Sequence, residues 1–281
     1  MIDLHTHSTC SDGSESPASV VEHAVASGCS AVALTDHDNL DGLAEARARA
    51  LELGIRLVQG CEVSCSTQTG TMHMLCYFIE EEDGPLQQEL AALQRDRERR
   101  NAVMVERLAD LGLAITYDEV LAEAGGRGVG RPHFAAVLMR HGLASSVNDA
   151  FERYLAKGRP GYVPKTRVEA PEIIELCRRS GGCAVLAHPL SLELEGDDLR
   201  RRLAELASAG LAGLECHYGR YGPDERHRLA DLAVDLGLVA TGGSDYHGSY
   251  KPDLEVGTGR GDLEVPESAL LELEERRPHT S

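Results

Sequence analysis

The sequence predicts an α/β protein of the barrel type, and three observations support this prediction. Short apolar segments typical of buried parallel strands alternate with amphipathic helical segments. Roughly seven such units follow one another, as a β/α barrel requires. Histidines recur at the predicted strand ends. An open doubly wound sheet is the alternative, but it would need a glycine-rich loop after the first strand, where His5-Thr-His7 stands.

The first 80 residues contain four predicted strands and two predicted helices. The first helix begins at Ser16-Pro17, with proline at the first helical position, and ends at Gly28. The second helix ends at Gly54. The strands are expected at 2–5, 31–35, 55–63 and 71–79, and the second helix at 41–53.

The pattern changes after residue 82. A long charged helix is predicted at 86–111, and no strand pattern appears before residue 167. Residues 95–167 carry 13 Lys or Arg and 9 Asp or Glu, whereas the rest of the chain carries 15 and 37. We therefore expect a helical, anion-binding insert at 95–167 in a barrel formed by 1–94 and 168–281. A solvated helical face with extra arginines is the alternative.

The β/α alternation resumes after the insert. Helices are predicted at 171–179, 198–209 and 224–236, and strands at 184–187, 211–217 and 238–241. One more strand after Asp245 and a helix at 267–275 complete the prediction.

The composition indicates which binding partners and which cellular compartment are expected for this protein. A net charge of −18 argues against duplex DNA, which needs a basic face. No apolar run is long enough for a membrane span, and no signal peptide is recognised, so a cytoplasmic protein without membrane contact is expected. The 8 cysteines lack metal-site spacing, which favours packing roles, including those of Cys10, Cys61 and Cys65.

Imidazole and carboxylate groups gather at the predicted strand ends, which meet at one face of a parallel barrel. His5 and His7, at positions i and i+2, point the same way. These groups are the donors that Zn, Mn and Fe prefer, and they are too many for one tetrahedral ion. We expect two to three divalent ions (Mn²⁺, Fe²⁺ or Zn²⁺) bound by strand-end residues, for which the candidates are His5, His7, His37, Glu62, His73, His188, Asp245 and His247.

Four motifs in order resemble those of the polymerase and histidinol phosphatase (PHP) family. They are His5-Thr-His7 with Asp12, Thr35-Asp36-His37-Asp38, Ala187-His188-Pro189, and Gly243-Ser-Asp245-Tyr-His247. The resemblance implies a distorted (β/α)7, TIM-like barrel with a trinuclear site. By position, one ion would take His5, His7, Glu62 and Asp245. A second would take Glu62, His73 and His188, and a third Asp12, His37 and His247.

The insert resembles that of a branch acting on nucleoside 3′,5′-bisphosphates, nucleoside monophosphates or short RNA ends. The resemblance implies that a small phosphorylated nucleotide, or a short single-stranded RNA, is the substrate. Arginine and lysine beside glycines also suit phosphate binding. The substrate-binding candidates are Arg100, Asn101, Arg131, His133, Lys157 and Lys165. Helix-capping or surface roles remain open for Arg131 and Lys157, as do core or capping roles for His133.

The expected reaction is hydrolysis of a phosphomonoester by a hydroxide that bridges the metal ions. His217 is the candidate general acid, because it ends a barrel strand without belonging to the ligand set. Asp36 is a catalytic candidate that would orient His37.

Three other functions were weighed. A histidinol-phosphate phosphatase would share the barrel and the metals, but a basic insert is unsuited to a cationic substrate. A metal-dependent amidohydrolase also begins with His-x-His, yet typically needs a strand-end lysine that this chain lacks. A non-catalytic metal-binding or polymerase-accessory domain is expected to lose ligands, whereas this chain keeps the whole set.

Overall fold

The computed structural model describes residues 1–81, 83–125 and 128–278. Its centre is a seven-stranded sheet whose strands follow one another in sequence order. The strands are β1 (Ile2–Asp3), β2 (Ala31–Leu34), β3 (Arg56–Cys65), β4 (Met72–Tyr77), β5 (Cys183–Leu186), β6 (Gly213–Tyr218) and β7 (Val239–Gly243). The two ends of the sheet meet, since Leu4 N donates to Gly242 O at 3.1 Å and Asp245 N donates to His5 O at 2.8 Å. The sheet is therefore nearly closed into the predicted barrel.

One strand runs against the prediction of a parallel sheet. β4 pairs antiparallel with both β3 and β5, while the other neighbours pair parallel. Only residues 66–71 separate β3 from β4. This connection is too short for a helical crossover, so the two strands form a hairpin. The start of β4, rather than its end, consequently lies at the same edge as the ends of its neighbours.

The helices outside the barrel are α1 (Pro17–Ala26), α2 (Leu43–Leu53), α7 (Ala170–Arg179), α8 (Gly196–Ser208), α9 (Pro223–Asp235) and α10 (Glu267–Glu275). Ser16 caps α1 by accepting from Ser19 N at 3.1 Å. Gly54 ends α2 with a left-handed φ of 69°. The strand expected after Asp245 is absent from residues 244–278, where a 3₁₀ turn (Gly248–Tyr250) precedes α10.

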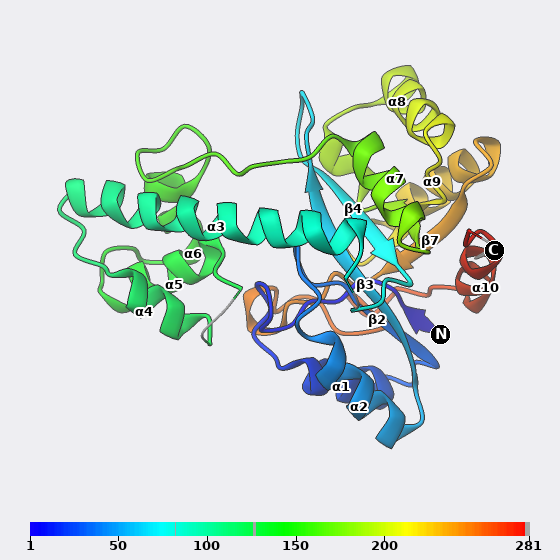
Figure 1. Cartoon of the computed structure of the whole chain (residues 1–281), viewed down its shortest axis with the longest axis horizontal. Helices are drawn as coiled ribbons and strands as arrows, with labels where there is room; N and C mark the ends of the chain where they lie inside the picture. The colour runs from blue at the N-terminus through cyan, green and yellow to red at the C-terminus, as the bar shows by residue number, and fades with distance from the viewer. Residues whose placement is uncertain (82, 126–127, 279–281) are drawn as a thin grey trace.

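The insert consists of helices packed at one end of the barrel (Figure 1). It contains α4 (Tyr117–Glu123), α5 (Arg131–Arg140), α6 (Val147–Ala150) and a π-helical turn (Phe151–Leu155). The long helix α3 (Pro85–Asp110) crosses the expected boundary at residue 95 without a break. Its first half contributes Leu86 and Leu90 to the barrel core, and its second half contributes Met104 and Leu108 to a separate insert core. α3 thus holds the insert against the barrel.

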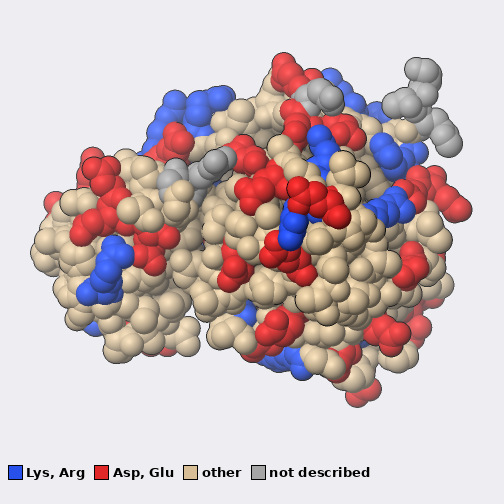
Figure 2. All heavy atoms as spheres, turned by 90° about the horizontal axis from the view of Figure 1, so that it is seen from below, with Lys and Arg blue, Asp and Glu red and all other residues tan. Residues whose placement is uncertain are grey.

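The surface agrees with the composition. Acidic side chains are spread over much of the face seen in Figure 2, as the net charge of −18 requires. Among the described residues, no helix is both long and apolar enough to span a bilayer.

Candidate metal centre and adjoining pocket

Four buried side chains converge on one point: His5 and His7 follow β1, Asp245 follows β7, and Glu62 lies within β3. His5 Nε2 lies 3.0 Å from His7 Nε2. Glu62 Oε2 is 3.4 Å from His5 Nε2 and 3.2 Å from His7 Nε2. Asp245 Oδ1 is 3.5 Å and 3.4 Å from the same nitrogens. Two ring nitrogens facing each other among carboxylate oxygens cannot satisfy one another, whereas a shared cation would satisfy all four groups.

The other oxygen of Glu62 extends the cluster. Glu62 Oε1 is 2.9 Å from His73 Nδ1 and 3.0 Å from His188 Nε2. His73 reaches the cluster although it stands near the start of its strand, because β4 is reversed. His188 follows β5 with a left-handed φ of 27°. Glu62 thus has the geometry of a bridging ligand between two groups.

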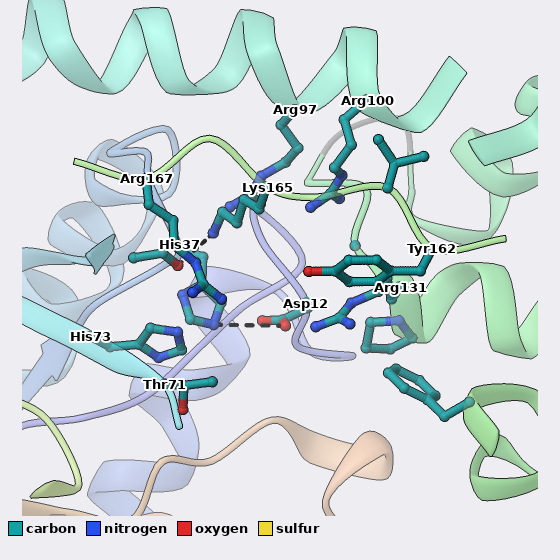
Figure 3. A pocket seen from close by; sticks show the side chains of 15 residues that line it. Asp12, His37, Thr71, His73, Arg97, Arg100, Arg131, Tyr162, Lys165 and Arg167 are labelled. Atoms are coloured by element: carbon teal, nitrogen blue, oxygen red, sulfur yellow. Dashed lines mark hydrogen bonds and ion pairs between the residues drawn. The ribbon is translucent and has the colours of Figure 1, made fainter. Parts of the chain in front are cut away.

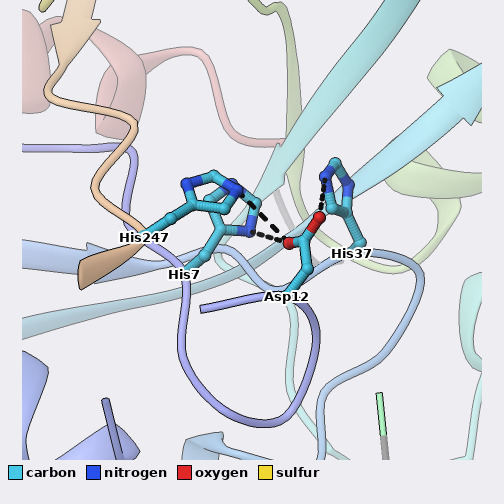
Figure 4. Close-up of side chains that lie close together, drawn as sticks. All are labelled: His7, Asp12, His37 and His247. Carbon is cyan, nitrogen blue, oxygen red and sulfur yellow. Dashed lines mark ion pairs between the residues drawn. The ribbon is translucent and has the colours of Figure 1, made fainter. Parts of the chain in front are cut away.

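The third group surrounds Asp12 (Figure 4). Asp12 Oδ1 is 3.2 Å from His247 Nε2 and 4.0 Å from His7 Nδ1. Asp12 Oδ2 is 3.8 Å from His37 Nε2. In addition, His37 Nδ1 lies 3.1 Å from Glu62 Oε2, which joins this group to the rest. All nine predicted ligands therefore meet in one connected cluster.

Hydrogen bonds fix the tautomers of three of these histidines. His5 Nδ1 donates to Glu215 at 2.8 Å, because an ionised carboxylate only accepts. His247 Nδ1 donates to Asp245 O at 2.8 Å. Ser191 Oγ donates to Thr71 O, so His188 Nδ1 donates to Ser191 Oγ at 2.9 Å. Each ring consequently presents an Nε2 lone pair to the cluster, as metal ligands do.

The electrostatics also fit divalent cations. Burial opposes ionisation of Glu62, but His37, His73 and His5 together hold its pKa well below the usual range. Burial lowers the pKa of His37 to about 3 although Glu62 and Asp12 oppose the shift. Asp12 Oδ1 and His37 Nδ1 are buried without a hydrogen-bond partner in the described chain. The neighbouring carboxylates, by contrast, raise the pKa of His5 and His7 although burial opposes the shift, that of His7 to about 9. Carboxylates that draw protons onto adjacent rings would also attract metal ions in place of those protons.

The candidate general acid is placed elsewhere. A bulge in β6 lies between Glu215 and His217, so the strict alternation of the strand is lost. Glu215 contacts His5, and Tyr218 OH donates to Asp245 Oδ2 at 2.7 Å. His217 has its electrostatic neighbours, Arg226 and His227, on α9. In the described residues no hydrogen bond or ion pair joins it to the cluster, so the geometry does not support an acid role for His217.

Asp36 acts on a loop rather than on His37. Its Oδ1 accepts from Ser8 N at 2.8 Å and from Ser11 Oγ at 2.5 Å, and its Oδ2 accepts from Ser8 Oγ at 2.6 Å. These bonds shape the turn that carries Asp12. The sequence-based expectation that Asp36 orients His37 is therefore replaced by support for the Asp12 loop.

A cavity of about 240 Å³ adjoins the cluster, between the barrel and the insert. Asp12, His37 and His73 are among the residues that line it, together with five cationic side chains (Figure 3). These cations are Arg97, Arg100, Arg131, Lys165 and Arg167. Sequence reasoning missed Arg97 and Arg167, because each stands in a charged or loop segment that resembles an ordinary solvated surface.

Two of the five cations share a buried carboxylate. Asp38, which is fully buried, forms ion pairs with Arg97 and, at 2.7 Å, with Lys165. Lys165 Nζ also donates to Ser64 Oγ at 2.6 Å. Burial lowers the pKa of Lys165 to about 8 although Asp38 opposes the shift. Asp38 therefore ties α3 and the chain returning from the insert to the barrel.

The other three cations have no carboxylate partner in the described chain. Arg100 donates to Asn101 Oδ1 at 2.7 Å. Arg131 lies over the rings of Phe151 and Tyr162, 5.5 and 5.7 Å from their centroids. Burial lowers the pKa of Arg100 to about 10, with the nearby Arg97 and Arg131 adding to the shift. This pocket is ready to receive an anion.

Three predicted substrate residues do not line the cavity. Asn101 is buried and donates to Val129 O at 3.0 Å, which joins α3 to the segment before α5. His133 Nδ1 accepts from Gly130 N at 3.0 Å and caps α5. Lys157 is exposed in the turn after the π-helical segment. The positions of His133 and Lys157 correspond to the capping and surface alternatives, whereas Arg100, Arg131 and Lys165 do line the cavity.

Replacing Asp38 by asparagine is expected to lower the free energy of unfolding by about 3–5 kcal/mol, because two buried cations would lose their counter-charge. Denaturant unfolding measures this loss. Asp235→Asn is the control, since Asp235 forms an exposed pair with Arg200 and its loss should cost less than about 1 kcal/mol. Equal small losses for both variants would show that Asp38 does not hold the insert.

The fold and the cluster define a class: a hydrolase that uses metal ions to cleave phosphate esters. The chain belongs to the PHP domain family, whose model matches residues 3–159. It is 36% identical over 248 residues to the 5′-3′ exoribonuclease Rnm of Escherichia coli, covering 87% of this chain and 84% of that protein. It is 33% identical over 257 residues to the 3′,5′-nucleoside bisphosphate phosphatase of Chromobacterium violaceum, covering 91% and 90%.

A solved structure is similar over the whole chain. A predicted metal-dependent phosphoesterase from Bifidobacterium adolescentis superimposes with a TM-score of 0.87 at 31% identity, covering 99% of this chain and 96% of that one. The chain is thus a metal-dependent phosphoesterase with the expected TIM-like fold. The alternative of a non-catalytic accessory domain is set aside.

Proposed function

We propose that this enzyme hydrolyses phosphomonoesters of small nucleotides, with nucleoside 3′,5′-bisphosphates as the preferred class. The observation that carries the proposal is the pairing of two anion sites. The His and carboxylate cluster would receive the scissile phosphate, and the same cavity is lined by the guanidinium groups of Arg100, Arg131 and Arg167, which have no carboxylate partner among the described residues. The activities named for the E. coli and C. violaceum relatives support a nucleotide substrate.

The nine clustered residues would hold two or three ions, for which Mn²⁺, Fe²⁺ and Zn²⁺ are the candidates. His5, His7, Glu62 and Asp245 would form one site; Glu62, His73 and His188 a second; Asp12, His37 and His247 a third. Ions bound there would supply a nucleophile near neutral pH and neutralise the charge on the phosphoryl oxygens.

The protein's own groups would bind and orient the substrate. Arg100, Arg131 and Arg167 would hold the second phosphate by charge-assisted hydrogen bonds. Lys165 and Arg97 would add positive charge, although Asp38 already engages both. The Tyr162 ring lies beside Arg131 at the cavity (Figure 3).

The size and charge of the site also bear on larger substrates. A cavity of about 240 Å³ lined by cations suits a small phosphorylated nucleotide or the end of a short single strand. The net charge of −18 is unfavourable for duplex DNA. Short RNA ends are therefore included in the proposal, and duplex DNA is excluded from it.

Phosphate release by the Mn²⁺-loaded enzyme tests the substrate class. We expect the highest kcat/KM for adenosine 3′,5′-bisphosphate, lower values for AMP and a 5′-phosphorylated RNA dinucleotide, and little activity on histidinol phosphate, whose ammonium group would meet the cationic pocket. A preference for histidinol phosphate would contradict the proposal and support the alternative phosphatase activity.

A further inference from the structure

Glu215 is a charged residue in the middle of a buried strand. It lies in β6 and is completely buried. Its Oε1 accepts from His5 Nδ1 at 2.8 Å. Its Oε2 accepts from the backbone N–H of His188 at 2.6 Å. Both oxygens are therefore used, and each contacts a different member of the ligand cluster.

The burial of this carboxylate needs an explanation. Removing a carboxylate from water costs several kcal/mol unless its partners compensate. In the described chain Glu215 forms an ion pair with His5 only, and no lysine or arginine approaches it. A leucine would fill the same place in an apolar core without that cost. The residue is accordingly better explained by its contacts with His5 and His188 than by the stability of the barrel.

The contact with His5 determines which ring nitrogen carries the proton. Because the carboxylate accepts, Nδ1 is protonated, and Nε2 is the nitrogen left to bind a metal ion. That Nε2 faces His7 Nε2 at 3.0 Å and Asp245 Oδ1 at 3.5 Å. The opposite tautomer would direct an N–H into the cluster and block coordination.

The contact with His188 supports an unusual backbone. His188 has a φ of 27°, in the left-handed region that a non-glycine residue rarely adopts. The bond from its N–H to Glu215 holds this conformation, and its Nε2 then lies 3.0 Å from Glu62 Oε1. The Glu215 carboxylate thus orients the ring of His5 in one ligand group and the backbone of His188 in another.

We propose that Glu215 is a positioning residue for the metal centre, which sets the tautomer of His5 and the backbone of His188 so that both rings can bind metal. The inference rests on the proposed ligand set. The bulge after Glu215 is part of the arrangement, because it also turns Tyr218 toward Asp245.

The test compares Glu215→Gln with two other variants. A glutamine keeps the volume but cannot accept at both positions, so its NH₂ group would oppose either His5 Nδ1–H or the His188 N–H. Chelator competition should show that Glu215→Gln binds Zn²⁺ about 10–100-fold more weakly than the wild type does.

Asp3→Asn is the matched control. Asp3 is equally buried, but it accepts from the backbone N–H groups of His5, Ser244 and Gly257, at 3.1, 2.9 and 2.7 Å, and from the Ser244 side chain, and among the described residues it contacts no ligand ring. Its substitution should lower the Tm with a smaller effect on Zn²⁺ affinity. His5→Gln tests the ligand set itself.

The outcomes separate the two ideas. If His5→Gln leaves Zn²⁺ affinity unchanged, the proposed ligand set is wrong. If His5→Gln weakens binding while Glu215→Gln binds Zn²⁺ like the wild type, only the role of Glu215 is wrong. If Asp3→Asn weakens Zn²⁺ binding as much as Glu215→Gln does at equal loss of Tm, Glu215 is merely structural.

A spectroscopic measurement covers the case in which Glu215→Gln does not fold. In ¹⁵N-histidine spectra of the Zn²⁺-loaded wild type, the His5 ring, assigned by its loss in His5→Gln, should show a protonated Nδ1 and a metal-bound Nε2. A protonated Nε2 would overturn the proposal.

Discussion

Replacing Glu62 by glutamine is expected to lower kcat/KM by on the order of 1,000-fold, since several kcal/mol of charge stabilisation by the ions would be lost. Glu62 Oε1 contacts His73 and His188, and Oε2 contacts His5, His7 and His37. The carboxamide of a glutamine would place N–H donors where the histidine nitrogens need an anionic partner or a metal ion. The variant should therefore also bind fewer ions, as elemental analysis after dialysis against Mn²⁺ would show.

The control for this variant is Glu175→Gln, because Glu175 is exposed on α7 and pairs only with Arg178 in the described chain. It should keep wild-type turnover and metal content. Circular dichroism of both variants shows whether they are folded. A folded Glu62→Gln protein with wild-type metal content and turnover would exclude Glu62 as the bridging ligand.

Replacing Arg131 by alanine is expected to raise KM for adenosine 3′,5′-bisphosphate by about 10–100-fold, the loss that corresponds to one or two charge-assisted hydrogen bonds. Turnover at saturation should change less, because Arg131 is proposed to contact the second phosphate and not the reacting one. KM for AMP, which lacks that phosphate, should change little. Steady-state phosphate release with both substrates measures the difference.

Two further variants make this experiment specific. Arg131→Lys keeps the charge but loses the planar fork, so it should recover only part of the affinity. Arg99→Ala removes an arginine whose side chain is 76% exposed on α3 and does not line the cavity, and it should leave both KM values unchanged. Equal rises in KM for AMP and for the bisphosphate would contradict this prediction. They would mean that Arg131 maintains the structure of the pocket and does not contact the second phosphate.

Much of the fold and of the cluster could be predicted, because both depend on local patterns. Alternating apolar and amphipathic segments gave the order of strands and helices. The position of His5, His37 and Asp245 at strand ends was enough to expect that they meet, since the ends of parallel strands share one face. His73 was included although its strand is antiparallel, and only the hairpin at 66–71 explains why it belongs.

The features of the site that were not predicted depend on contacts between residues that are distant in the sequence. The bulge in β6 leaves no clear local signal, so His217 was expected at the site and Glu215 was overlooked. Arg97 stands in a charged run typical of a solvated helix, yet its partner Asp38 lies on the loop after β2. Caps such as that of His133 on Gly130 also become visible only when the backbone geometry is known.

The most direct test of the account is a titration of the metal-free enzyme with Mn²⁺, in which bound ions per chain and phosphate release from adenosine 3′,5′-bisphosphate are measured together. We predict that the metal-free chain is inactive and that activity rises only as more than one ion binds, reaching its maximum at two to three ions per chain. Full activity with a single ion, or a fully loaded chain that releases no phosphate from this substrate, would contradict the account.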